Sequence, residues 1–331
     1  MKTLAFFNNK GGVGKTSLVY HLAWMFTEQG LNVLAVDLDP QANLTAMFLR
    51  ESRLEQLWPD DNHPKTVLGA IQPILEGLGD VASPHLEKIP SIRLSLVPGD
   101  LGLSRFEDKL SDAWPRCHNG DAAAFRAMTA FYRMAHAGGE ECRADIILMD
   151  VGPNLGAINR AALIAADHVV VPLAADLFSL QGLRNLGPTL REWRRIWERL
   201  LPQKPENLNV PKGTMQPIGY VVSQHGILES RPVRSYQRWL ERIPGTYRQS
   251  VLGKTEKNAP ESGKDPNALA LLKHYRSLMP MAMEAHKPIF ALKSADGAIG
   301  SHIEAVHACH EDFLNLARRI AALIGLDMDG S

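Results

Sequence analysis

A glycine-rich loop near the start of the chain, residues 10–16, reads KGGVGKT. The apolar run 4–7 precedes the loop, and residues 18–24 follow it with the apolar spacing of a helix, so we expect the order strand, loop, helix. Glycines let backbone N–H groups turn toward a phosphate, a lysine adds a cation, and a hydroxyl at the start of a helix can bind Mg²⁺. The loop therefore predicts a nucleoside triphosphate site.

The expected nucleotide contacts run through the loop into the first helical turn. Lys15 is expected to bind the β- and γ-phosphate oxygens, and Thr16 to bind Mg²⁺. The backbone of the glycine-rich stretch would hold the β-phosphate. The full set of predicted nucleotide-binding residues is Lys10, Gly11, Gly12, Val13, Gly14, Lys15, Thr16 and Ser17.

Carboxylates stand at the ends of two other strand-like segments. One apolar run leads to Asp37 and Asp39, and another, residues 146–149, leads to Asp150. A single aspartate in such a place is more often a strand-end or helix-cap residue. Parallel strands, however, bring their carboxyl ends to one edge of a sheet, where ligands bind. We therefore expect Thr16, Asp37, Asp39 and Asp150 to surround the metal.

The loop departs from the common phosphate-loop pattern in a specific way. Asn9 stands where that pattern has glycine, and a second lysine, Lys10, lies inside the loop. The resulting pattern, K-G-G-x-G-K-[ST], resembles the deviant Walker A loop of the ParA/MinD group of P-loop ATPases. Residues 33–45, 146–154 and 159–172 also resemble ParA proteins, and residues 286–290 and 296–298 do so more loosely. The resemblance covers residues 1–182 and about 285–320.

The resemblance implies ATP and Mg²⁺ as cofactors and an ATP-dependent homodimer. It assigns catalytic roles to three residues: Lys10, which reaches the nucleotide of the second subunit, Lys15, and Asp39, which orients the attacking water. The alternative for Lys10 is a solvated loop lysine. ATP as the nucleotide is carried over from the family, since residues 223–226 read SQHG and the GTPase motif N-K-x-D is absent from the sequence.

Composition limits the class of protein. The 331 residues are 45% apolar, enough for one large core, and no run approaches the ~20 apolar residues that span a bilayer. No signal region precedes the first strand, so we expect a cytoplasmic protein. The three cysteines form no C-x-x-C pair, so neither a disulfide framework nor a metal cluster is expected. No helix-turn-helix segment precedes the first strand, which argues against site-specific repression.

The zero net charge conceals a basic third of the chain. Residues 183–264 hold fifteen Lys or Arg against seven Asp or Glu. If residues 231–242 are helical, four arginines share one face and are candidates for non-specific contacts to DNA phosphates. They are Arg231, Arg234, Arg238 and Arg242. The alternative is a solvated helix face. DNA binding would place the protein at the nucleoid.

The order of predicted elements favours an α/β fold, a doubly wound, mostly parallel sheet of the P-loop NTPase type. We expect one domain over residues 1–331, with helical or loop insertions near 50–90 and 200–285. Predicted strands lie at 2–8, 32–38, 92–97, 144–150, 168–173 and 217–222. Predicted helices lie at 15–29, 65–76, 121–137, 155–166, 179–201, 231–242, 266–278 and 302–324.

Together these patterns favour a ParA-like ATPase that switches between monomer and dimer, binds DNA without sequence preference and positions a cargo such as a plasmid, chromosome or large complex. The resemblance also implies an activating adaptor protein. One alternative is a MinD-like switch acting on a protein or membrane, but the tail 316–326 is expected to pack on the sheet rather than on lipid. The other is a P-loop ligase or synthetase acting on a small molecule.

Overall fold

An eight-stranded sheet forms the centre of the computed structural model, which describes residues 1–90, 92–223, 233–254, 265–273, 275 and 278–328. The strand order is β3-β4-β2-β5-β1-β6-β7-β8. All neighbouring pairs are parallel except β3 and β4. The strands are β1 (Lys2–Phe6), β2 (Val33–Leu38), β3 (Glu87–Ile89), β4 (Leu94–Val97), β5 (Ile146–Val151), β6 (His168–Ala174), β7 (Gln216–Ser223) and β8 (Ala268–Leu272).

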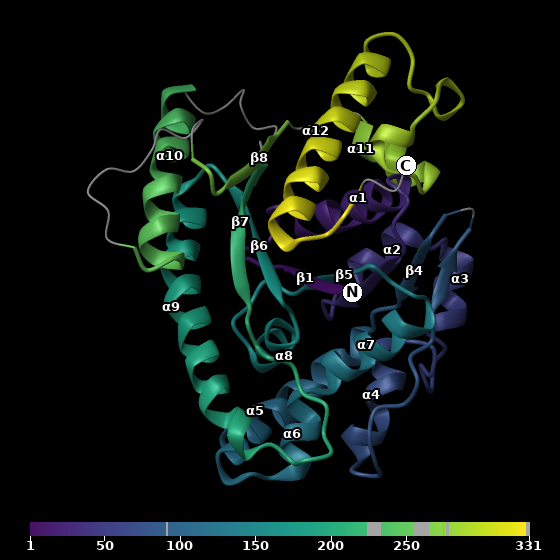
Figure 1. Cartoon of the computed structure of the whole chain (residues 1–331). Coiled ribbons are helices and arrows are strands. Elements are labelled where there is room, and N and C mark those ends of the chain that lie inside the picture. Colours follow the sequence, from purple (N-terminus) through teal and green to yellow (C-terminus); the bar gives the residue numbers. More distant parts are fainter. Residues whose placement is uncertain (91, 224–232, 255–264, 274, 276–277, 329–331) are drawn as a thin grey trace.

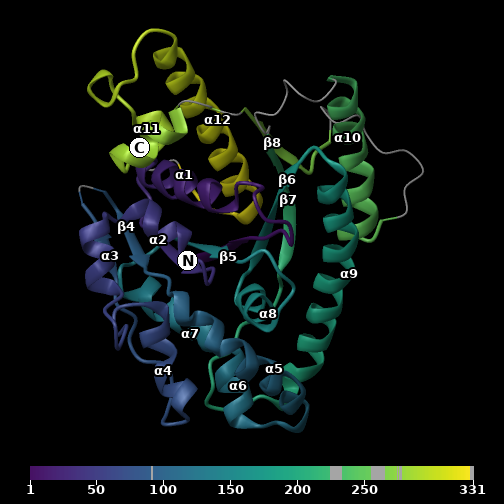
Figure 2. The same ribbon diagram turned by 180° about the vertical axis from the view of Figure 1, so that it is seen from behind.

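Helices cover both faces of this sheet, as Figures 1 and 2 show. One face carries α1 (Lys15–Glu28), α2 (Asn43–Phe48), α11 (Leu278–Ala285) and α12 (Ser301–Ile324). The other carries α4 (Val67–Glu76), α5 (Phe106–Arg116), α6 (Ala122–Met128), α7 (Ala130–Glu141), α8 (Ala157–Ile164), α9 (Leu177–Leu200) and α10 (Val233–Thr246). A further helix, α3 (Glu51–Leu57), follows α2.

The pleat of the central strands explains the two cores. Leu4 and Phe6 of β1 point to the face of α1 and α12, whereas Ala5 points to the face of α7 and α8. The same alternation holds along β2 and β5, and these strands are buried throughout. Strands buried on both faces read as continuous apolar runs. The doubly wound α/β fold expected from the sequence is therefore confirmed.

The prediction of a helix over residues 266–278 is wrong. Residues 268–272 form β8, which pairs in parallel with β7 at the edge of the sheet, and helix α11 begins only at Leu278. The sequence ALALL consists of strong helix formers, but pairing with β7 outweighs that preference. The predicted helix 121–137 is two helices, α6 and α7, and α5 and β3 were not predicted.

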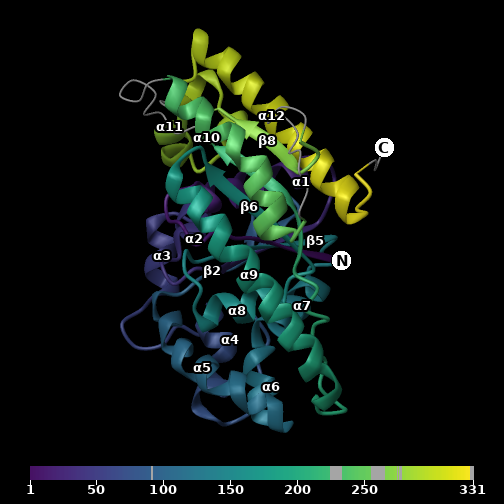
Figure 3. The ribbon, with the colours of Figure 1, turned by 90° about the vertical axis from the view of Figure 1, so that its left-hand side faces the viewer.

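The C-terminal helix packs inward. Its buried face includes Phe313, Leu316 and Ile320, which join the core of the α1 face, as expected for the tail. Figure 3 shows α12 running beside β8 and α1. Within the part of the chain that the structure describes, no helix is long and apolar enough to cross a membrane.

Candidate nucleotide site at the carboxyl edge of the sheet

The phosphate loop connects the carboxyl end of β1 to the first residue of α1, Lys15. Gly12 and Gly14 have φ angles of 71° and 81°, in the left-handed region that favours glycine. Val13 is buried and anchors the loop, whereas Gly11 and Gly12 are exposed. The loop thus has the strand, glycine turn and helix order that was predicted, with the N-terminus of α1 available to an anion.

Three predicted carboxylates meet Lys15 beside this loop. In the strand register Phe6 of β1 pairs with Asp150 of β5, which in turn pairs with Asp37 of β2. Asp37 and Asp150 are 0% exposed, Asp39 is 5% exposed and Lys15 is 6% exposed. The topology therefore gathers residues from three separate segments, the ends of β2 and β5 and the start of α1, at one buried point.

Burial and mutual repulsion dominate the electrostatics of the carboxylates. Burial, followed by the neighbouring charge of Asp37, raises the pKa of Asp150 well above its usual range. Burial likewise lowers the pKa of Lys15, although the charges of Asp150 and Asp39 oppose that shift. Each pair of like charges makes a bound cation favourable at this point.

The donor set fits Mg²⁺. Both carboxylate oxygens of Asp150 are buried and make no hydrogen bond of good geometry among the described residues, although the Thr16 hydroxyl is close enough to oppose the rise in the pKa of this group. The described residues contain no group of three or more His, Cys, Asp or Glu arranged to hold a metal on their own. Mg²⁺ is usually bound by one or two carboxylates together with waters and substrate phosphates, so this sparse set suits it.

Asp37 is already engaged by the protein. Its Oδ2 accepts hydrogen bonds from the Thr45 backbone N–H at 2.8 Å and from the Thr45 hydroxyl at 2.7 Å. The same hydroxyl accepts a hydrogen bond from Gly99 N–H at 2.7 Å. Burial raises the pKa of Asp37 to about 7. Asp37 is therefore held in a fixed position by Thr45, a residue for which the sequence predicts no role.

Asp39 faces the loop that follows β5. Its Oδ1 accepts a hydrogen bond from Gln41 N–H at 3.0 Å, and a Cβ built on Gly152 would lie 3.5 Å from the same oxygen. Asn159 of α8 donates from Nδ2 to the Gly152 carbonyl at 2.9 Å and to the Asn154 carbonyl at 2.7 Å. Asn159 thereby ties the loop after Asp150 to α8, a role that sequence reasoning did not assign.

Lys10 does not join the carboxylate cluster. Its Nζ forms an ion pair with Asp176 Oδ2 and lies 5.8 Å from the centre of the Phe178 ring. The structure thus separates the two loop lysines. Lys15 is buried among Asp39 and Asp150, whereas Lys10 points toward the start of α9.

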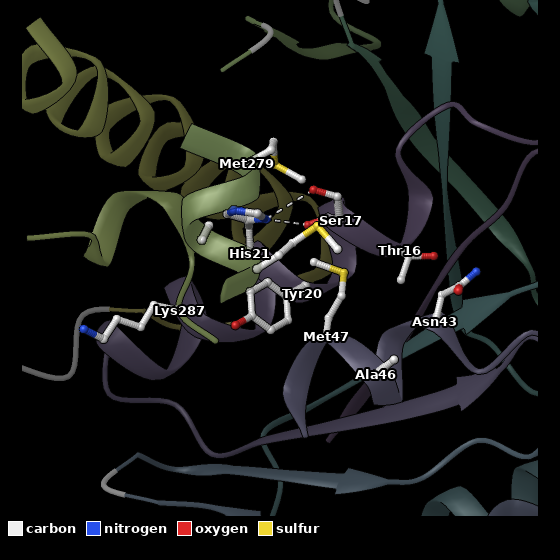
Figure 4. Close-up of a pocket in the computed structure, with 11 residues that line it drawn as sticks. Thr16, Ser17, Tyr20, His21, Asn43, Ala46, Met47, Met279 and Lys287 are labelled. Atoms are coloured by element: carbon white, nitrogen blue, oxygen red, sulfur yellow. Dashed lines mark hydrogen bonds between the residues drawn. The ribbon is translucent and has the colours of Figure 1, made fainter. Parts of the chain in front are cut away.

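Two cavities flank the phosphate loop. One of about 350 Å³ lies between α1, α2 and α11, and Figure 4 shows Met47 and Met279 on opposite sides of it, with Thr16 at its edge. The other, about 330 Å³, lies between the loop glycines and the ends of β7 and β8. Both are lined by His21, whose Nδ1 bonds the Ser17 carbonyl at 2.7 Å and whose Nε2 accepts from Ile289 N–H at 3.1 Å.

The predicted DNA-binding residues are described in part. Arg231 lies outside the described residues, and Arg234 is described only as part of helix α10. Arg238 and Arg242 are exposed, and their guanidinium groups lie 5.4 Å and 5.1 Å from the ring of Trp239 between them. The opposite face of α10 packs on the core through partly buried Tyr236 and Leu240.

Some arginines of the basic third have structural roles instead. Arg191 of α9 donates to the Ser250 and Val251 carbonyls, and Arg194 donates to the Met215 carbonyl at 2.6 Å. Trp193 and Trp197 of the same helix are buried. The basic surface is therefore smaller than the residue count indicates.

Comparisons with known proteins agree with this geometry. A family model described as an AAA domain matches residues 1–201. Protein IncC of Escherichia coli is 32% identical over 195 residues, which are 59% of this chain and 47% of IncC. The chain spans about half the length of the curated relatives named first among its matches.

Two solved structures extend the likeness to the whole chain. Protein DIP2308 from Corynebacterium diphtheriae has a TM-score of 0.68 at 26% identity, covering 98% of this chain and 99% of that one. An ATP complex of Cyanothece McdA has a TM-score of 0.62 at 15% identity, covering 99% and 97%. The second likeness concerns the fold alone. With the family match over residues 1–201, these findings show that the chain belongs to the AAA-domain family, within the ParA and MinD group of P-loop ATPases.

Proposed function

We propose that this protein hydrolyses ATP and uses the nucleotide to switch between a monomer and a homodimer that binds DNA. The observation that carries the proposal is the meeting of Lys15, Asp39 and the unsatisfied carboxylate of Asp150 at the phosphate loop. This arrangement joins a phosphate-binding cation to a metal-binding carboxylate and a second carboxylate beside them. That set of groups is what phosphoryl transfer to water requires.

The position of each site residue indicates its role in ATP hydrolysis. The backbone of residues 11–16 and the Lys15 ammonium group would hold the outer phosphates, and Thr16 and Asp150 would hold Mg²⁺. Mg²⁺, when bound, neutralises charge on the phosphate oxygens. Asp39, held by Gln41 and facing Gly152, would orient the attacking water as its acceptor. Asp37 accepts two hydrogen bonds from Thr45 and so fixes the start of α2 against the carboxyl end of β2.

Dimerisation would supply the remaining cation. Lys10 lies outside the carboxylate cluster, on the exposed side of the loop, with a quarter of its side chain exposed. In a dimer with the two loops facing each other, Lys10 of each protomer would reach the phosphates of the partner's nucleotide, as the family resemblance implies. Hydrolysis would then depend on a second copy, as in enzymes that receive an arginine finger from a partner.

The exposed arginines of α10 favour DNA as the binding partner. Arg238 and Arg242 are exposed, and their guanidinium groups lie within cation–π range of the Trp239 ring. Such a surface would bind phosphates without sequence preference and would place the protein at the nucleoid in the cytoplasm. We further propose that an adaptor protein stimulates hydrolysis and that the switch moves a cargo. A membrane-bound switch is less favoured because the apolar face of α12 is buried in the core.

The decisive test measures retention of a DNA duplex of arbitrary sequence by the full-length protein at low and high salt, with ATP, with ADP and without nucleotide. We expect retention only with ATP and a steep loss of affinity as salt rises. Lys15→Ala should bind neither ATP nor DNA, while its circular dichroism spectrum stays that of the parent. If the parent binds ATP but retains no duplex at low salt, a switch acting on a protein partner takes the place of the DNA-binding one.

A further inference from the structure

The N-terminus of α8 is capped by a side chain from another helix. Gly156, which precedes α8, has no side chain that could bind the first N–H groups of the helix. Glu107, in the first turn of α5, binds them instead. Its Oε1 accepts a hydrogen bond from Ala157 N–H at 2.5 Å, and its Oε2 accepts one from Ile158 N–H at 2.9 Å. A carboxylate at this end of a helix also interacts favourably with the helix dipole, so Glu107 fixes the point where α8 begins.

Gly156 lets this carboxylate approach closely. A Cβ built on Gly156 would lie 2.7 Å from Glu107 Oε1 and 2.8 Å from Asn154 Oδ1, closer than a Cβ atom comes to a neighbouring atom in folded proteins. Any other residue at position 156 would therefore displace these two side chains. The φ angle of Gly156 is −76°, which every residue adopts, so the close approach, and not the backbone conformation, requires a glycine here.

The capped end of α8 is also the end of the loop that follows β5. Residues 152–156 form this loop, and Asn159 of α8 donates from Nδ2 to the Gly152 and Asn154 carbonyls within it. Because Asn159 belongs to α8, a shift of the helix start would carry Gly152 with it. Gly152 is the residue that faces Asp39, the carboxylate that we assign to the attacking water.

The helix that carries Glu107 is anchored on the opposite side of the site. Residues 99–107 lead from the end of β4 into α5, and Gly99 N–H donates to the Thr45 hydroxyl at 2.7 Å. A Cβ on Gly99 would lie 2.8 Å from Asp37 Oδ2. Figures 1 and 3 show α5 beside α8. One short segment thus contacts the end of β2 at its start and the loop after β5 at its end.

Resting on the proposed function, we propose that Glu107 is a positioning residue for ATP hydrolysis. It fixes the start of α8, and through α8 it holds Gly152 against Asp39. The phosphate loop is held separately, by β1 and α1, so binding of the outer phosphates does not depend on Glu107. A misplacement of about 1 Å at a reacting group can slow a reaction about 100-fold, so loss of Glu107 should slow turnover about 10- to 100-fold.

Three substitutions test this role. Glu107→Ala removes both hydrogen bonds to α8. Glu107→Gln keeps one acceptor oxygen and replaces the other with an NH₂ group, which cannot accept from an N–H, so it should restore part of the turnover. Gly156→Ala displaces the carboxylate without removing it, because the new Cβ would occupy the space of Oε1, and it should also slow hydrolysis.

Two control variants separate positioning from loss of charge and from loss of stability. Asp108→Ala removes an exposed acid from the same turn of α5. Asp121→Ala removes a carboxylate that accepts from the Ala123 and Ala124 N–H groups of α6, at 2.9 Å and 3.1 Å, and so destroys a cap of the same kind on another helix. It also breaks a partly exposed ion pair with Arg116, which contributes little to stability. Both controls should hydrolyse ATP at the parental rate.

The experiment combines three measurements on each variant. Turnover is measured at saturating Mg²⁺ and ATP, affinity and dimerisation are measured with a slowly hydrolysed ATP analogue, and amide hydrogen exchange is measured in the nucleotide-free protein. We expect Glu107→Ala to lose about 10- to 100-fold in turnover while its affinity for the analogue stays within about 3-fold of the parental value. It should dimerise as the parent does, and exchange should be faster at Ala157 and Ile158.

The outcomes separate this role from a structural one and from the proposed function. If the parent hydrolyses ATP and Glu107→Ala does so at the same rate, the positioning role is overturned and the proposed function stands. A loss of affinity or of dimerisation as large as the loss of turnover overturns the role as well, and so does an equal slowing in Asp121→Ala. A parent that binds ATP without hydrolysing it contradicts the proposed function, and the role of Glu107 in hydrolysis falls with it.

Discussion

Asp37 and Asp150 lie directly opposite each other across β2 and β5, and both side chains are 0% exposed. Burial is the main reason why the pKa of each carboxyl group is raised; the charge of Asp37 adds to the shift of Asp150, and the charge of Asp39 adds to that of Asp37. Hydrogen bonds from Thr45 compensate part of this cost at Asp37, and the Thr16 hydroxyl compensates part of it at Asp150. Burying the two carboxylates side by side is therefore electrostatically unfavourable, and a bound divalent cation would offset that free-energy cost.

The first prediction follows from that cost. Asp150→Asn removes one of the two charges without changing shape, so we expect the nucleotide-free protein to become more stable, on the order of 1 kcal/mol at pH 8. The variant should at the same time lose the additional stabilisation that Mg²⁺ with ATP gives the parent. Urea unfolding with and without Mg²⁺ and ATP measures both effects, and an unaltered response to Mg²⁺ would remove Asp150 from the metal site.

Thr45 supplies the second prediction. Its hydroxyl donates to Asp37 and accepts from Gly99, so Thr45→Val leaves a buried carboxylate and a buried N–H each short of a partner. We expect a loss of about 2 kcal/mol in unfolding free energy, and recovery of most of it in Thr45→Ser. Thr27→Val, which removes only a hydrogen bond within α1, is the control. Equal losses in Thr45→Ser and Thr45→Val would show that packing, and not the hydroxyl, matters.

Local sequence patterns predict part of this site. The phosphate loop and the aspartates at 37, 39 and 150 are local patterns at strand ends, so the order of elements alone was enough to place them together. Thr45, Asp176 and Asn159 act through partners that are distant in sequence or carry no chemical signature, and only the packed sheet brings those contacts together. Residues 268–272 were misread because alanine and leucine favour a helix, whereas the exposed edge of β7 offered a strand partner.

The third prediction concerns His21. Burial lowers the pKa of His21 from 6.5 to about 4, and the hydrogen bond between Nδ1 and the Ser17 carbonyl opposes only part of that shift. Since the folded-state pKa is depressed, the unfolded chain binds more protons between pH 6.5 and 4, and stability falls as pH falls through that window. The expected loss is about 3 kcal/mol for this group. Comparing the pH dependence of unfolding of the parent with that of His21→Asn isolates it, and parallel profiles would contradict the assignment.

The fourth prediction tests Asp39 as the acceptor of the water proton. Asp39→Ala should bind ATP with near-normal affinity but hydrolyse it at least 100-fold more slowly, a typical loss for a general base. Because the nucleotide then persists, the variant should accumulate as an ATP dimer in sedimentation. Glu55→Ala, an exposed change on helix α3, is the control. Turnover at the parental rate in Asp39→Ala would move the role to another residue.

The last prediction concerns the exposed arginines of α10. Arg238 and Arg242 are exposed and lie within cation–π range of Trp239, so we expect each to bind a DNA phosphate. Replacing both with Glu should weaken binding to any duplex and flatten the dependence of log affinity on log salt by about 0.9 for each phosphate that the protein no longer neutralises. ATP binding should not change, because α10 contributes no residue to the described lining of either cavity beside the phosphate loop.

A matched pair of substitutions separates local binding from overall charge. Lys65→Glu with Arg126→Glu makes the same change in net charge on exposed residues of the opposite end of the molecule. If α10 is the DNA surface, the Arg238/Arg242 variant should lose most of its affinity and the Lys65/Arg126 variant little of it, because screening at physiological salt limits the reach of a charge to about 8 Å. Equal losses of affinity in the two variants would mean that DNA binding depends only on the net charge of the protein, and would contradict the assignment of α10 as the DNA-binding surface.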